Sequence, residues 1–481
     1  MKKKNILILL SLTIYCILFY QQSIGINLLI YNLLMISILL IIDLSILKNR
    51  NWQLVAIGAI ITSVSAFLYG SVLSAIGNVI SLILLSNLSM EKSSSLVFSF
   101  IQSGLSYVCK PFVALTNFID RIISNDEENK KNKITRNNIL RILIPTVVLL
   151  VFFLIYKNSN AIFSSFIDSI EIDISWNFIK FLIIGFYLIA IFFNHYSYPR
   201  LIETDKKYGN RLIAENSTEK SFFSTITAEL SSANLTFWLL NGLLLIVNFL
   251  DVKFILTGSK SISNYSEYIH QGINSSIFSV VIAILVTLYF FRGNLNFVSE
   301  NKTLKILALS WVAQNIILLL TCLHKNYSYI DEMGLTQKRL GVFFYLLVTL
   351  IGLILTWIKI TRLKSNVYLV RTNTWSLFMI LIISSLFNWN RIILNYNRTH
   401  KKLVEREYYF NQLPKTSLPY LVENWRNLPF ESNTYPSDKE FKAKLESRKR
   451  RFIKFYESKQ WQSWNLEDDR IYLEIKKIDS Y

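Results

Sequence analysis

Long apolar runs alternate with short charged loops from residue 6 to about residue 393. Two of these runs, residues 306–323 and 341–357, contain no lysine, arginine, aspartate or glutamate. Since an α-helix rises about 1.5 Å per residue, roughly 20 such residues cross the apolar core of a bilayer. The runs are continuous rather than alternating, and only helices or closed barrels satisfy their own backbone hydrogen bonds in lipid. The sequence therefore predicts an all-α, polytopic transmembrane helical bundle.

The composition supports a membrane location. Hydrophobic residues make up 52% of the 481 and charged residues only 17%, too few for a water-soluble protein of this length. A net charge of +19 would favour nucleic-acid binding in a soluble protein, but the cytoplasmic loops of membrane proteins collect lysine and arginine. The three cysteines form no disulfide framework and no CxxC pattern. We therefore expect membrane lipids as partners, no nucleic acid, no metal and no cofactor, while a protein partner stays open.

About eleven runs are long enough to be spans, with ten or twelve as alternatives. The first run follows three lysines and also resembles a signal peptide, but a second apolar run comes directly after it. The predicted spans are residues 6–20, 28–47, 52–69, 72–88, 142–156, 178–193, 232–250, 277–291, 306–323, 341–357 and 375–387.

The distribution of positive charge predicts the orientation in a bacterial inner (plasma) membrane. With residues 2–4 inside, 25 lysines and arginines fall in the inside segments and six in the outside loops. The positive-inside rule then places the N-terminus in the cytoplasm. An odd number of spans places the polar segment after residue 390 on the extracytoplasmic side, because long domains cross membranes largely regardless of their charge.

Polar segments divide the chain into four predicted parts. Residues 1–90 form a four-span block. Residues 91–139 form cytoplasmic interfacial helices, broken by Pro111, and a mobile polar linker. Residues 140–396 form a seven-span membrane domain. Residues 397–481 form a small soluble helical domain, in which a capping box at Ser437 opens a helix to about Glu457.

Several short segments of the second half share a recognisable pattern. They are Asn241 to Leu243, Asn248, Asp251, residues 265–272, residues 329–339, Asn388, Asn390, residues 395–397 and residues 461–466. Together they resemble the bacterial membrane proteins grouped as domain of unknown function 4153/4173, over roughly residues 178–466, and the first four spans are only loosely similar. The Gly-Leu-Thr-x-x-Arg element at residues 334–339 is the most specific part, although Met333 replaces the family's usual tyrosine. The resemblance implies an integral membrane protein without an established activity, and it supplies no catalytic residue.

The predicted outside loop at residues 326–339 combines aromatic and charged side chains. These are Tyr329, Asp331, Glu332, Lys338 and Arg339. Arg339 adjoins a span, so it can pair with an acidic neighbour or bind a lipid phosphate. The simpler alternative is a helix start, with Thr336 as its cap and a salt bridge that fixes the loop.

A second outside loop contributes Glu267 and His270, which are three residues apart and share a face on a helix. Both loops open on the same predicted side of the membrane. We therefore expect a candidate external cleft formed by Glu267, His270, Tyr329, Asp331, Glu332 and Arg339. The alternative is an interfacial helix with solvated polar residues.

Three polar residues are candidates inside the membrane, namely Asp43, Asn241 and Asn248. A carboxylate within a span is a functional suspect, although Asp43 lies about one turn from Lys48 and can reach the inner surface. The two asparagines can hydrogen-bond between helices, which usually serves packing.

The motifs of common enzymes are absent, including HExxH, GxSxG and the P-loop. Transport would require ion-handling groups or broken helices at the midplane, and Asp43 is the only deep acid. A ligand-binding or lipid-binding, signalling or envelope-associated role needs only external loops, the C-terminal domain and a stable bundle. The sequence favours such a binding, signalling or envelope-associated role, and we assign no catalytic residues. The alternatives are a small-molecule or ion transporter and, less strongly, a membrane-embedded transferase.

Overall fold

The structure is a computed structural model. It describes residues 3–123, 176–194, 198–213, 226–257, 265–402, 404–430 and 437–479, with isolated positions between 145 and 160. Throughout this part of the chain the regular structure is helical, apart from one isolated bridge between Arg211 and Lys364. The predicted all-α fold is confirmed.

The chain forms two compact units. One unit comprises residues 1–20 and 100–198, and the other comprises residues 21–99 and 199–481. In the first unit, α1 (Lys3–Phe19) packs against α8 (Trp176–Phe193), and the ring of Tyr15 stacks on Phe181 with 4.6 Å between centroids. The division into four parts made from the sequence stays a prediction.

The helix α5 (Leu96–Ile123) continues through Pro111, where the sequence predicted a break. Proline has no backbone N–H, so the carbonyl of Tyr107, four residues earlier, loses its helical partner. The hydroxyl of Tyr187 in α8 donates a hydrogen bond to that carbonyl. The Tyr187 hydroxyl therefore replaces the missing N–H donor for the Tyr107 carbonyl, and the helix continues.

Seven helices in the described residues are long and apolar enough to cross a membrane, and three shorter apolar helices accompany them. All ten coincide with predicted spans, whereas the eleventh predicted span, residues 142–156, lies mostly outside the described residues. The seven are α3 (Arg50–Tyr69), α4 (Val72–Met90), α8, α10 (Ile226–Thr257), α12 (Lys302–Met333), α13 (Gln337–Thr361) and α14 (Asn366–Ser385). The shorter apolar segments are α1, α2 (Ile26–Ile42) and Phe278–Phe290 within α11 (Tyr265–Phe290).

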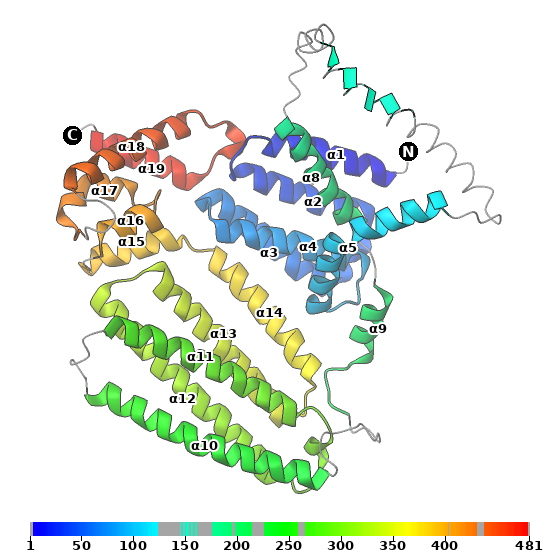
Figure 1. The fold of residues 1–481 in the computed structure, drawn as a ribbon, viewed down its shortest axis with the longest axis vertical. Helices are drawn as coiled ribbons and strands as arrows, with labels where there is room; N and C mark the ends of the chain where they lie inside the picture. Colours follow the sequence, from blue (N-terminus) through cyan, green and yellow to red (C-terminus); the bar gives the residue numbers. More distant parts are fainter. Residues whose placement is uncertain are drawn as a thin grey trace. The chain divides into compact units, whose positions relative to one another are not determined.

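Two groups of membrane helices form within the second unit. The helices α10 to α13 lie side by side (Figure 1), and Trp311 packs on Phe237 in their shared core with ring centroids 5.3 Å apart. In the other group, Asn32 of α2 and Asn78 of α4 each donate a hydrogen bond of 2.9 Å to the carbonyl of Ala59 in α3. Such small and amide-bearing residues hold helices together in lipid, where apolar contact alone gives little preference. The helix α14 packs on α3, α4 and α13 and so joins the groups.

Several helix ends differ from the predicted ones, and two of them concern candidate residues. The span predicted over residues 28–47 ends at Ile42, because Asp43 is extended and its carboxylate accepts a hydrogen bond of 2.9 Å from the backbone of Ser45, which opens the 3-10 helix η1 (Leu44–Lys48). The loop predicted over residues 326–339 is mostly helical, since α12 continues to Met333. With 32 residues, α12 exceeds the roughly 20 that a bilayer requires, so its end extends beyond the apolar core.

The helices after α14 share a hydrophobic core within the second unit, and we refer to them as the C-terminal domain. Its core also contains Ile330 and Leu335, which belong to the corner between α12 and α13. Ser437 accepts a hydrogen bond of 3.2 Å from the backbone of Glu440, which confirms the predicted cap. The helices are α15 (Trp389–Thr399), α16 (Arg406–Gln412), α17 (Leu418–Asn424), α18 (Asp438–Glu457) and α19 (Leu466–Asp479), with the 3-10 helix η4 (Trp461–Ser463).

Candidate functional site

The Gly-Leu-Thr-x-x-Arg element forms the corner between α12 and α13. Gly334 has φ +80° and ψ 172°, a backbone region that is essentially restricted to glycine. The hydroxyl of Thr336 accepts a hydrogen bond of 3.4 Å from the backbone of Arg339 and caps α13, as the simpler sequence alternative held. The guanidinium of Arg339 donates to the carbonyls of Met333 and Gly334 and lies 4.0 Å from the ring centre of Tyr329. Arg339 therefore closes the end of α12.

The C-terminal domain docks on this corner through Asn397 of α15. The side-chain amide of Asn397 accepts a hydrogen bond of 2.7 Å from the backbone N–H of Leu335 and donates one of 2.9 Å to its carbonyl. Nearby, the ammonium of Lys402 lies 3.0 Å from the carboxylate of Asp331. The partner of Asp331 is thus Lys402 of the C-terminal segment. The Gly-Leu-Thr-x-x-Arg element is therefore a point at which the C-terminal domain docks.

A second docking point joins residues 461–466 to the loop before α2. The carbonyl of Trp464 accepts a hydrogen bond of 2.9 Å from the backbone of Ile26, and the hydroxyl of Ser463 accepts one of 2.9 Å from the backbone of Ser23. A Cβ atom on Gly25 would lie 2.4 Å from the Trp464 carbonyl oxygen. The close approach explains why this loop carries a glycine.

A cleft of about 600 Å³ opens where the C-terminal domain meets the end of α3. Its apolar wall includes Leu68 of α3, Ile392 of α15 and Leu473 of α19. Its polar wall includes Asn388, Arg391 and Asn395 of α15, with Glu467, Asp469 and Arg470 of α19. Both helices belong to the C-terminal domain, and its packing on α3 closes the cleft.

Arg391 connects the two polar sides of the cleft. Its Nε atom donates a hydrogen bond of 3.2 Å to Glu467, and its Nη1 atom donates one of 2.9 Å to Glu474. Burial alone would lower the pKa of Arg391, but these two carboxylates outweigh burial and raise it, so the guanidinium stays charged. Asp469 accepts a hydrogen bond of 2.5 Å from the hydroxyl of Tyr456, and burial together with this bond raises the pKa of Tyr456 to about 12.

The predicted external cleft is only partly described. Tyr329 and Arg339 lie together, as given above, while Glu332 is exposed at the end of α12. Glu267 and His270 both lie in α11, but their side chains fall outside the described residues. A cleft that joins all six residues stays a prediction.

The intramembrane asparagines link α10 to α12. The amide of Asn241 donates a hydrogen bond of 2.9 Å to the carbonyl of Leu307 and accepts one of 2.8 Å from Gln314. Asn248 donates one of 3.0 Å to the carbonyl of Gln314. These contacts fit the role in helix packing that we gave for both asparagines from the sequence.

Asp43 lies at the end of α2 and pairs with Lys92, whose ammonium is 2.7 Å from its carboxylate. This hydrogen-bonded pair, together with hydrogen bonds from Ser45, lowers the pKa of Asp43 to about 2. About 40% of the Asp43 side chain is exposed. Lys48 lies only about one turn away in the sequence, but the lysine that pairs with Asp43 comes from beyond α4.

Sequence reasoning missed a buried ion pair and the central cation of the cleft. Lys325 of α12 and Asp251 of α10 lie 2.8 Å apart, with side chains 8% and 16% exposed. Asp251 stood within a family-like segment, but Lys325 counted as a loop residue. Arg391 stood between the singled-out Asn388 and Asn395, and its position on an amphipathic 11-residue helix was the available signal.

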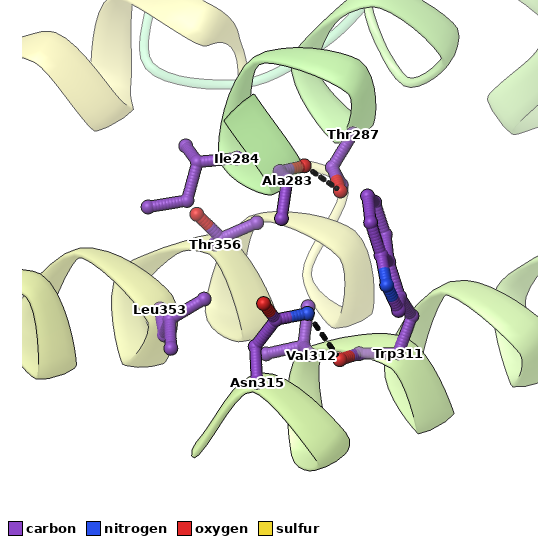
Figure 2. A pocket seen from close by; sticks show the side chains of 8 residues that line it. All are labelled: Ala283, Ile284, Thr287, Trp311, Val312, Asn315, Leu353 and Thr356. Carbon is purple, nitrogen blue, oxygen red and sulfur yellow. Dashed lines mark hydrogen bonds between the residues drawn. The ribbon is translucent and has the colours of Figure 1, made fainter. Parts of the chain in front are cut away.

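A smaller gap lies among α11, α12 and α13 (Figure 2). Its polar side chains are satisfied by their own helices, since Thr287 donates a hydrogen bond of 2.9 Å to the carbonyl of Ala283 and Asn315 one of 2.8 Å to that of Trp311. The gap leaves no volume for a water molecule. It therefore belongs to the packing of the bundle.

Comparison with known proteins identifies one family. The profile described as "Domain of unknown function (DUF4153)" matches residues 6–424. The match includes the first four spans, which the sequence resemblance covered only loosely, and it ends before residues 461–466. No curated protein and no solved structure matches the chain.

Proposed function

This chain belongs to the DUF4153 family of unknown function, and from that premise we propose that it is an integral membrane protein that binds a small amphiphilic ligand on its extracytoplasmic side. The observation that carries the proposal is the cleft of about 600 Å³ between α3, α15 and α19. Clefts of roughly 300–1,000 Å³ with apolar walls and a few polar groups are typical of small-molecule sites.

The grouping of the loops supports the proposed side. The C-terminal domain contacts the loop before α2 and the corner at residues 334–336, both of which charge counting assigns to the outside. At the other ends of the helices, Asp205 accepts a hydrogen bond of 2.7 Å from the backbone of Ser95 and pairs with Arg371 at 2.7 Å. Those segments are the lysine- and arginine-rich ones assigned to the inside. The contacts and the charges thus divide the loops in the same way.

A transporter has weaker support. The gap among α11, α12 and α13 has no room for water, and Asp43 lies at the end of a helix in an ion pair with Lys92. Transport would need a hydrated path or an ion-handling group near the midplane.

Photocrosslinking tests the proposed binding. Cells that express the full-length protein are fed a clickable fatty acid with a diazirine, which they incorporate into their phospholipids. After irradiation, mass spectrometry locates the label on peptides of the protein. We expect label on the α19 peptide, because Leu473 lines the cleft although α19 lies outside the predicted spans.

Leu473→Trp places a larger side chain in the cleft and should abolish the label on α19. Ala443→Trp introduces the same side chain at an exposed position of α18 and serves as the matched control. An α19 peptide that is unlabelled in the natural protein, or labelled equally in Leu473→Trp, contradicts the proposal.

A further inference from the structure

The charges that line the cleft balance one another. Its walls include two cations, Arg391 and Arg470, and two anions, Glu467 and Asp469. A ligand with charge of a single sign would meet repulsion as well as attraction in this lining. A ligand that carries both signs finds a partner for each.

The lining carboxylates lie on α19, whereas the cations lie on both helices, Arg391 on α15 and Arg470 on α19. On α15, the Nη2 atom of Arg391 is buried and lies 3.1 Å from Glu467, but within the described residues it forms no hydrogen bond of good geometry. The amide of Asn395 on the same helix is exposed and also lines the cleft. On α19, the lining carboxylates are Glu467 and Asp469. The α15 side offers the exposed Asn395 amide and the positive charge of Arg391 to an anion, and the carboxylates of α19 can accept from a cation.

We propose that the cleft recognises the phosphoethanolamine headgroup of a membrane phospholipid, an inference that rests on the proposed function. The phosphate lies against Arg391 and Asn395, and the ammonium donates to Asp469. Planar guanidinium groups bind phosphate oxygens through charge-assisted hydrogen bonds. The primary ammonium offers three N–H donors, so it suits a carboxylate.

The apolar wall selects a lipid over the free headgroup. Leu68, Ile392 and Leu473 line the same cleft as the charged groups. Burying their surface against the glycerol backbone and the first acyl carbons contributes roughly 25 cal/mol per Å². Soluble glycerophosphoethanolamine carries the same charges without that contribution, so it binds more weakly.

Native mass spectrometry of the purified full-length protein in detergent tests the headgroup. The protein is titrated with phosphatidylethanolamine, phosphatidylcholine and phosphatidylglycerol of identical acyl chains, and with glycerophosphoethanolamine. Only the binding that Leu473→Trp removes is counted, which excludes lipids bound elsewhere on the bundle. We expect phosphatidylethanolamine to bind about tenfold more tightly than phosphatidylglycerol, since one charge-assisted hydrogen bond contributes about this much. Phosphatidylcholine, whose methyl groups replace the N–H donors, should bind less tightly than phosphatidylethanolamine.

Asp469→Asn removes the charge that faces the ammonium but keeps an acceptor for Tyr456. It should weaken binding of phosphatidylethanolamine about tenfold without weakening that of phosphatidylglycerol. Glu446→Gln makes the same chemical change on α18, away from the cleft lining, and should leave both unchanged.

The outcomes separate the two proposals. Lipid binding that Leu473→Trp removes, but that is equal for the two headgroups, overturns the headgroup assignment and leaves the proposed function intact. Absence of any binding that Leu473→Trp removes overturns the proposed function. Tighter binding of phosphatidylglycerol to the natural protein, or a gain of phosphatidylethanolamine affinity in Asp469→Asn, overturns the zwitterionic assignment.

Discussion

At the scale of single residues, several side chains form hydrogen bonds with backbone groups that have no partner within a helix. Tyr187 donates to a carbonyl that Pro111 leaves without its helical partner. Arg339 donates to the carbonyl of Met333 at the end of α12, and Asn397 serves both backbone groups of Leu335. An unpaired backbone group away from water costs about as much as a lost hydrogen bond, so each of these side chains allows a helix to continue, end or dock where it does.

The corner at Gly334 gives the first prediction. Gly334→Ala should lower the free energy of unfolding by about 2 kcal/mol, because a side chain is strained in this backbone region. The new Cβ atom would also lie 2.6 Å from Cγ2 of Val404. The thermal unfolding midpoint of the protein in detergent measures the effect. Gly341→Ala is the control, because a Cβ atom there meets nothing within 4 Å, and an equal midpoint for both variants would refute the prediction.

The interior carboxylate Asp468 predicts a dependence on pH. It lies 2.5 Å from the ammonium of Lys459 and 3.3 Å from that of Lys415. Burial acts to raise the pKa of Asp468, but the two ammonium groups outweigh burial and hold the pKa below its usual 3.8. A carboxyl group with a lowered pKa stabilises the folded state above its unfolded pKa, and this contribution is lost as the pH falls through the folded pKa. We expect the C-terminal domain to lose stability below about pH 4.

Hydrogen exchange of the α19 peptides, corrected for the intrinsic effect of pH, measures this loss. Asp468→Asn should exchange faster at neutral pH and show a flatter profile below about pH 4, since the titrating group is gone. An equally steep acid profile in the variant would assign the loss to other carboxylates.

Helix length matters at the scale of elements, because α10 and α12 each have 32 residues and so extend beyond the roughly 20 that cross a bilayer. The ion pair between Asp251 and Lys325 joins these two helices. Lys325→Met should lower the free energy of unfolding by about 3 kcal/mol, because it leaves a mostly buried carboxylate without its partner. The double variant Asp251→Leu with Lys325→Met should recover most of that loss. A double-mutant cycle on thermal unfolding in detergent tests this, and purely additive losses would contradict it.

The spans were predictable from the sequence, because the length of an apolar run must match the thickness of the bilayer. The helix ends were not, since polar residues such as Lys325 and Tyr329 are typical of a loop until tertiary contacts with α10 and Arg339 are known. The cleft was also out of reach. Arg391 and Glu467 are 76 positions apart in the sequence, and no local pattern indicates that they pair.

Within the second unit as a whole, the C-terminal domain contacts loops of both helix groups. Because these loops are the ones assigned to the outside, the contacts predict that the C-terminal domain lies on the extracytoplasmic side of the membrane. In a cysteine-free background, Ser437→Cys should react with a membrane-impermeant maleimide added to intact cells. Glu300→Cys, exposed at the opposite ends of the helices before α12, should react only after lysis. Reaction of Glu300→Cys with protection of Ser437→Cys would reverse the proposed orientation, and reaction of both in intact cells would refute the grouping of the loops.

The bond between Ser23 and Ser463 joins residues 440 positions apart. A ribosome adds about 5–20 residues per second, so residue 463 emerges roughly 20 to 90 s after residue 23. During that interval the loop around Gly25 is already made, but the backbone N–H groups of Ser23 and Ile26 still lack the partners that Ser463 and Trp464 later provide. Completion of this contact is therefore a late event in biogenesis, which follows the synthesis of nearly the whole chain.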